Sequence, residues 1–146
     1  LLRNWILVYT GNFIGSIATV IGIYLAAQYK FGHGAIGINA LAIADAKIHY
    51  SFLQAVMLGI FCNALVCLAV WLCLSARSTT DKVLSIIFPI TAFVAAGFEH
   101  SVANIFFIPM GLFIKMDHAF MAQIGANYAD LTWGNFLWRN LLPVTI

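Results

Sequence analysis

The 146-residue chain is 63% hydrophobic and only 8% charged. An ordinary soluble domain carries about 25% charged residues, so this chain has too few polar side chains to coat a globule in water. Lipid must therefore cover most of its surface. The formal net charge of +2 at pH 7 is too small to indicate a nucleic-acid partner. We expect an all-α protein that crosses a lipid bilayer several times.

Two stretches are long and apolar enough for membrane-spanning helices, each of which needs about 20 residues. The first covers about 5–27 and the second about 48–74. The segment 29–47 between them is interrupted by glycines and is expected to be a connection that lies on the protein surface or dips into it. Small residues recur at near-four-residue spacing in both spans, which lets helix backbones approach closely. This spacing predicts a tightly packed bundle.

A third apolar stretch, about 82–114, is too long for one simple span. Gly97 is a natural helix stop, and Ser101 can cap a new helix that begins one residue later. The sequence therefore predicts a broken helix made of two halves, about 82–96 and 102–114. The loop between them lies at membrane depth, which is tolerated only inside protein or beside a water-filled cavity.

This predicted loop carries an acid and an imidazole, Glu99 and His100. A charge at the bilayer centre costs about 2.5–3.5 kcal/mol on insertion scales, so both side chains must face protein or water. An unperturbed histidine titrates near pH 6.5 and can lend a proton to a weak-acid anion and take it back. We expect Glu99 to brace the exposed backbone of the helix break, while a pure packing role for His100 stays open.

The end of the chain is expected to form a loop over 115–135 and to start a further helix at about 136–146. Here "RNLLPVTI" at 139–146 repeats part of "RNWILVYTGN" at 3–12, because both have Arg-Asn and a valine four residues after the asparagine. Two short matches can arise by chance, but internal repeats are typical of transporters and channels. If the two segments are equivalent helices of two repeats, the chain is a fragment of a longer protein.

The blocks "AFVAAGFEHSVANIFFIPMGL" and "DAKIHYSFLQAVMLGIFCNALVCLAVW", with "RNW" and "YTGNFIG" near the start, closely resemble the formate/nitrite transporter family. The segment "NIFFIPMG" is most similar to the formate channels of that family. The resemblance implies an aquaporin-like six-helix bundle with inverted repeats and broken helices. It also implies a multi-pass homopentamer in the inner (cytoplasmic) membrane. This chain would supply helices three to five and the approach to helix six.

The resemblance also implies roles for individual residues. His100 matches the central pore histidine, Lys47 the lysine that draws anions toward the pore, and Asn63 a polar pore-lining residue. Lysine disfavours helix N-termini, yet Lys47 falls where the helix at about 48–74 is expected to begin. The residues matched to the constriction are Val66, Phe93 and Phe98. The residues matched to the support of the pore loop are Glu99, which points away from the pore in that fold, Gly97, Ser101 and Asn104.

Together these features predict a passive or proton-coupled channel for small monovalent anions rather than an enzyme. Formate is the anion that we expect first. His100 would stabilise the anion or protonate it transiently, and no cofactor or metal is expected. Nitrite or hydrosulfide selectivity is the alternative within the family. A remote alternative is a haem-binding membrane oxidoreductase subunit that uses His49 together with His100.

Overall fold

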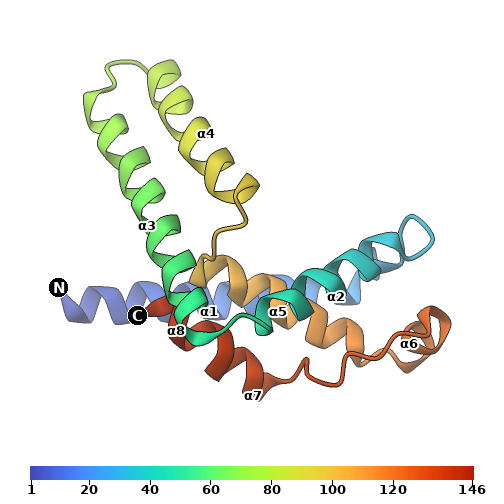
Figure 1. Cartoon of the computed structure of the whole chain (residues 1–146). Coiled ribbons are helices and arrows are strands. Elements are labelled where there is room, and N and C mark those ends of the chain that lie inside the picture. Colours follow the sequence, from blue (N-terminus) through green and yellow to red (C-terminus); the bar gives the residue numbers. More distant parts are fainter.

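The computed structural model describes all 146 residues, and the chain folds into helices joined by turns (Figure 1). Two helices, α1 (Leu2–Leu25) and α3 (Phe52–Ser75), are long and apolar enough to cross a membrane. The other helical segments are η1 (Gln28–Lys30), α2 (Ala35–Ile48), α4 (Thr79–Ala95), α5 (Ser101–Lys115), α6 (His118–Ile124), α7 (Trp133–Asn135), the π-helical η2 (Phe136–Leu141) and α8 (Leu142–Thr145).

The helices form two groups that meet near the middle of the molecule (Figure 1). In the first group, α5 packs against both α1 and α2, and η2 returns along the same group, whereas α8 packs against α3. In the second group, α3 and α4 form an antiparallel hairpin that projects away. The main hydrophobic core of 13 buried residues belongs to the first group, with no member from α3 or α4. The break between α4 and α5 therefore lies at the junction of the two groups.

The segment 29–47, expected to be a connection, contains α2 instead. Its glycines serve the helix: Gly34 adopts a left-handed φ of 86° at the N-cap. Gly37 lets the helix approach its neighbours, since a Cβ there would lie 2.7 Å from the ring of Phe120. The expected loop 115–135 likewise contains α6 and α7. In both places packing against α5 or η1 stabilises short helices that glycine and polar residues disfavour locally.

The helix break falls at residues 96–100, between α4 and α5. Gly97 has a left-handed φ of 69°, which glycine adopts without steric cost. Its N–H donates to the carbonyl of Val94 at 3.1 Å, and the N–H of Phe98 donates to that of Phe93 at 3.0 Å. These two bonds form the Schellman motif that ends many helices. The chain is thus free to turn into the loop that carries Glu99 and His100.

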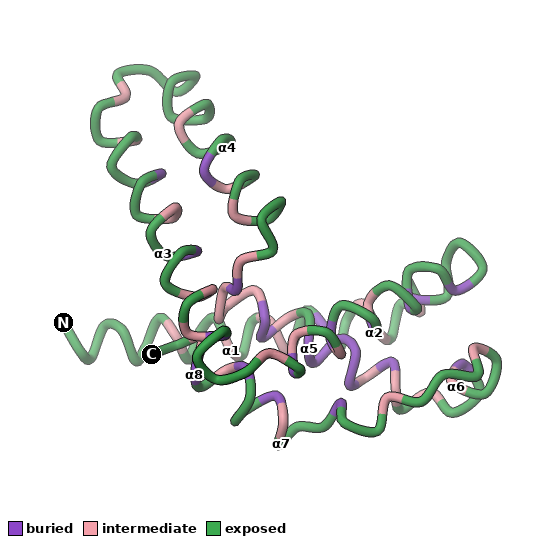
Figure 2. The backbone as a smooth tube through the Cα atoms, viewed as in Figure 1, coloured by how far each residue is buried: buried purple, intermediate pink, exposed green.

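Most of the surface is apolar and exposed. Only 25 of 146 residues are buried, and Figure 2 shows exposed backbone along α3, α4 and the first half of α1. The accessible surface of 9077 Å² exceeds the roughly 7,400 Å² expected for a compact soluble protein of this mass. Lipid or further protein is needed to cover these faces.

The backbones of α2 and α5 approach each other closely. A Cβ added at Gly111 would be 2.4 Å from the Cβ of Ala44. In contrast, the small-residue strip of α1 faces open space in this chain, with no atom within 4 Å of a Cβ added at Gly11, Gly15 or Gly22. Close packing therefore occurs at α2 and α5, and the strip of α1 has no partner within these residues.

A polar cluster joins the segment that follows the C-terminal end of α1 to the turn that follows the C-terminal end of α5. Asp117 accepts hydrogen bonds from the Tyr29 hydroxyl at 2.6 Å and the Phe120 N–H at 3.1 Å, and it pairs with the Lys30 ammonium at 3.0 Å. These donors, Tyr29 foremost, hold the pKa of Asp117 well below its usual range. The cluster connects η1 to the corner between α5 and α6.

Candidate functional site

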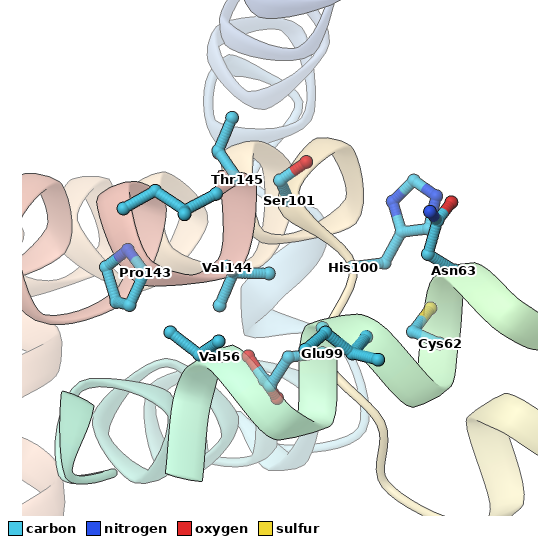
Figure 3. Close-up of a pocket in the computed structure, with 12 residues that line it drawn as sticks. Val56, Cys62, Asn63, Glu99, His100, Ser101, Pro143, Val144 and Thr145 are labelled. Carbon is cyan, nitrogen blue, oxygen red and sulfur yellow. The ribbon is translucent and has the colours of Figure 1, made fainter. Parts of the chain in front are cut away.

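A cavity of about 220 Å³ lies where the helix break meets α3 and α8 (Figure 3). Its walls come from three parts of the chain that are far apart in sequence: α3, the break with the start of α5, and the C-terminal residues. Gly59 permits the approach of α8, since a Cβ there would lie 3.2 Å from the carbonyl oxygen of Val144. The lining residues are Val56, Gly59, Ile60, Cys62, Asn63, Glu99, His100, Ser101, Pro143, Val144, Thr145 and Ile146.

His100 is the N-cap of α5, a position that the sequence assigned to Ser101. Its Nδ1 accepts a hydrogen bond from the N–H of Ala103 at 3.4 Å, so Ser101 becomes the first residue of the helix. A neutral imidazole whose Nδ1 accepts must carry its proton on Nε2. The ring is half-buried and stacks against Phe93, with 6.0 Å between the ring centroids. His100 thus enters the cavity wall with Nε2–H as a donor.

Asn63 of α3 lines the same cavity as His100, and Figure 3 shows the amide and the imidazole on the same side of the loop. Its Oδ1 lies 4.0 Å from the thiol of Cys67, one turn along the helix, and its Nδ2 donates to no group of the chain. The N-terminal end of α5, where the helix dipole is positive, also borders the cavity through Ser101. The cavity therefore combines several hydrogen-bond donors with apolar walls, which suits a small anion.

The carboxylate of Glu99 is turned away from the imidazole (Figure 3) and is almost fully buried, at 1% exposed. One oxygen pairs with the Lys47 ammonium at 2.6 Å. The other accepts from the side-chain amides of Asn104 at 2.6 Å and Asn140 at 3.0 Å. Asn140 also donates to the backbone carbonyl of Lys47 at 2.9 Å. This network joins the break to α2, α5 and η2.

Lys47 lies in the last turn of α2, not at the start of the next helix. The ammonium of Lys47 is therefore favourably placed at a helix C-terminus. The unfavourable position at a helix N-terminus, which the sequence suggested for this lysine, does not occur. The side chain is 16% exposed, and its Nζ lies 5.7 Å from the ring centroid of Phe107. Lys47 contacts Glu99 and does not line the cavity.

The three residues matched to a constriction are not brought together on the cavity wall. Phe93 contacts the imidazole of His100. Phe98 stacks on Phe61 of α3, with 5.6 Å between centroids. Val66 is half-buried on α3, one turn beyond Asn63. A role for Val66 in a constriction stays a prediction.

Two further residues differ from the sequence reading. Asn140 is fully buried in the Glu99 network, although only its place in the repeated Arg-Asn pair marked it in the sequence. His49, which the haem alternative pairs with His100, instead lies at the C-terminal end of α2 and contacts Asp45 of that helix and Asp130 of the segment before α7. Its Nδ1 lies 2.7 Å from the carbonyl oxygen of Asp45, and its Nε2 lies 3.6 Å from the carboxylate of Asp130.

A sequence model described as formate/nitrite transporter matches residues 1–146, the whole chain. The chain belongs to the formate/nitrite transporter family. The formate channel FocA of Escherichia coli (strain K12) is 45% identical over 152 residues, which cover 100% of this chain and 53% of the relative. A probable formate transporter of Methanothermobacter thermautotrophicus is 35% identical over 159 residues, covering 100% of this chain and 53% of the relative.

Among solved structures, a pentameric formate channel with formate bound matches with a TM-score of 0.94 and 50% identity. The match covers 99% of this chain and 59% of that one. The expected membrane fold is thereby confirmed, and the family together with the long apolar helices makes this a multi-pass membrane protein. The chain spans about half the length of the curated relatives it matches.

Proposed function

We propose that the protein to which this chain belongs is a transmembrane channel for small monovalent anions, with formate as its preferred substrate. Its working form would be a homopentamer in the inner (cytoplasmic) membrane. The observation that carries this proposal is the cavity at the helix break, where His100 and Asn63 meet as hydrogen-bond donors. The relatives named as formate channels and the structure with formate bound support the choice of substrate and assembly.

The neutral ring of His100 can stabilise a passing carboxylate directly. Its Nδ1 accepts from the N–H of Ala103, so Nε2–H is the donor left for an oxygen of the anion. The Nδ2 of Asn63 and the positive end of α5 add further favourable interactions. These donors replace part of the water that a small anion loses in an apolar passage. Phe93 stacked on the ring keeps it oriented.

Proton transfer requires a doubly protonated His100. The Nε2–H bond then breaks, an O–H bond forms on the anion, and the neutral acid leaves a neutral imidazole behind. A doubly protonated ring carries hydrogen on Nδ1 as well, so it cannot accept the hydrogen bond from Ala103 that the structure contains. Hydrogen bonding by the neutral ring is therefore the primary role, with protonation as a second mode that disrupts the helix cap.

Lys47 serves this site through Glu99. An uncompensated carboxylate next to the cavity would repel an anion, and the ammonium at 2.6 Å cancels that charge. The same ion pair, with the amides of Asn104 and Asn140, holds the loop in the position that presents His100. Lys47 is therefore proposed as a positioning residue whose charge also reduces the electrostatic barrier to anions.

The test is formate flux into liposomes that contain the full-length protein. His100→Ala is expected to change the rate or the selectivity for formate, whereas His118→Ala, an exposed histidine outside the cavity, should behave as wild type. Nitrite and hydrosulfide belong in the same assay. If His100→Ala matches wild type, His100 is a packing residue and the mechanism fails. If nitrite or hydrosulfide passes faster than formate, the assigned substrate is wrong while the site stands.

A further inference from the structure

A lysine without an acidic partner lies at the C-terminal end of α5, away from the helix break. Lys115 is the last residue of that helix, and its side chain is half-buried. Its ammonium donates to the backbone carbonyls of Tyr128 at 2.7 Å and Leu131 at 2.9 Å. These two bonds attach the segment between α6 and α7 to the end of α5. An ammonium has three N–H donors, so one N–H of Lys115 is left without an acceptor in the chain.

The charge of Lys115 is not balanced by a carboxylate, since none of the ion pairs of the chain includes it. The two nearest acids in the sequence have other partners. Asp117 pairs with the Lys30 ammonium at 3.0 Å, and the carboxylate of Asp130 lies 3.6 Å from Nε2 of His49. Backbone carbonyls carry only partial charges, so a half-buried ammonium is stabilised further by an anion.

The ammonium borders a second cavity, of about 410 Å³. This volume is within the range of about 300–1,000 Å³ that is typical of small-ligand sites. Polar and apolar side chains both line it, so the cavity matches a ligand that joins an anionic group to an apolar one. Its polar residues are Lys115, His118 and Thr132, and its apolar residues include Leu112, Leu131 and Trp133.

Aromatic contacts place this second cavity at the level where α1 ends. Because α1 is long and apolar enough to cross a membrane, its C-terminal end marks a membrane surface. The ring of Tyr24, in the last turn of α1, lies 5.8 Å from the ring of Phe113, which lies 6.3 Å from that of Trp133. Trp and Tyr are enriched at the depth of the lipid headgroups. Trp133 is 44% exposed, so the cavity meets the surroundings at that depth.

We propose that this second cavity binds the headgroup of an anionic phospholipid. The phosphate accepts a hydrogen bond from the free N–H of Lys115 and supplies the missing negative charge. The apolar part of the lipid packs against Trp133 and Leu112. A lipid is favoured over a free anion because the lining is partly apolar and lies at headgroup depth. The site is separate from the cavity with His100 and does not depend on the substrate.

The test compares the melting temperature of the purified full-length protein in detergent with added phosphatidylglycerol, phosphatidylcholine or inorganic phosphate. Phosphatidylglycerol should raise the value for wild type by at least about 2 °C more than phosphatidylcholine does, since a ligand that binds the folded state stabilises it. Lys115→Gln should lose this difference, whereas Lys115→Arg preserves the charge and should keep it. The control Lys82→Gln removes an exposed lysine outside the cavity and should also keep the difference.

Thr132→Asp gives an independent check with Lys115 intact. The Thr132 hydroxyl accepts from the N–H of Asn135 at 3.2 Å as the N-cap of α7. Aspartate is an equally good N-cap, so the start of the helix is preserved. The new carboxylate would repel the phosphate and offer the ammonium a competing partner. Phosphatidylglycerol should therefore stabilise this variant no more than phosphatidylcholine does.

The proposal is wrong if the two lipids shift the melting temperature of wild type equally. It is also wrong if either Lys115→Gln or Thr132→Asp keeps the preference for phosphatidylglycerol, because the lipid then binds elsewhere. If inorganic phosphate alone reproduces the stabilisation, the ligand is a free anion and not a lipid.

Should both variants fail to fold, the structure of wild type in nanodiscs that contain phosphatidylglycerol decides. A phosphate within hydrogen-bond distance of Lys115 Nζ supports the proposal. A neighbouring subunit, another segment of the same subunit or only water in that place overturns it.

Discussion

Removal of the Lys47 ammonium is expected to destabilise the protein strongly. Glu99 is 1% exposed, and without Lys47 its carboxylate would keep only the amides of Asn104 and Asn140 as partners. Breaking a buried ion pair by deleting one member costs about 3–5 kcal/mol, because the other charge stays buried without compensation. Lys47 is 16% exposed, so water reaches part of this site, and we expect a loss near about 3 kcal/mol.

Lys47→Met in the full-length protein tests this value, because methionine preserves the apolar stem of the side chain. About 3 kcal/mol corresponds to a decrease in melting temperature of roughly 6–12 °C for a domain of comparable size. The double variant Lys47→Met/Glu99→Gln removes the buried charge and should recover much of the loss. Lys82→Met removes an exposed lysine at the start of α4 and should leave the melting temperature unchanged.

The opposite pattern would refute the positioning role. If Lys47→Met melts as wild type but needs a higher formate concentration to reach the same flux, the ammonium acts by attracting anions and its pairing with Glu99 contributes little. If the double variant is no more stable than Lys47→Met, the loss does not come from the buried carboxylate. In that case the ion pair is not what holds the loop.

Two further predictions concern the scaffold. Gly111→Ala should destabilise the protein by about 1–3 kcal/mol through overpacking, because the new Cβ would lie 2.4 Å from the Cβ of Ala44. Gly134→Ala is the control, since the atom nearest to a Cβ there is 3.9 Å away. Equal melting temperatures for the two variants would contradict this prediction. Asp117 has a lowered pKa, so its contribution to stability is present above about pH 4 and is lost as the pH falls further. The melting temperature of wild type should therefore decrease more steeply below about pH 4 than that of Asp117→Asn, and equal slopes would count against the cluster.

Features with a local cause were predictable from the sequence. The lengths of the apolar stretches predicted the two long helices, and Gly97 predicted the end of α4 because only glycine adopts its left-handed conformation freely. The likeness of the "GFEHSVAN" block to one family identified the fold and the membrane setting. In each case the deciding residues are neighbours in the chain.

Features that depend on distant residues were not predictable. α2 escaped detection because Gly37 weakens the helix locally, and its packing against Phe120 and α5 compensates for this. The partner of Lys47 could not be deduced, since Glu99 lies 52 positions away. Asn140 reaches Lys47 across 93 positions, and a single asparagine in an apolar stretch gives no sign of such a contact.

The action of His100 on the permeating anion is best examined through the rate and the pH dependence of formate flux in liposomes with the full-length protein. His100→Asn keeps a side-chain donor but cannot change its charge between about pH 5 and pH 8, whereas histidine can. We expect this variant to conduct formate at neutral pH, at a reduced rate, and to lose the pH dependence that wild type shows in this range. If His100→Asn keeps the pH profile of wild type, protonation of His100 does not affect flux, and if His100→Leu, which has no donor, conducts formate as fast as wild type, His100 does not act on the permeating anion.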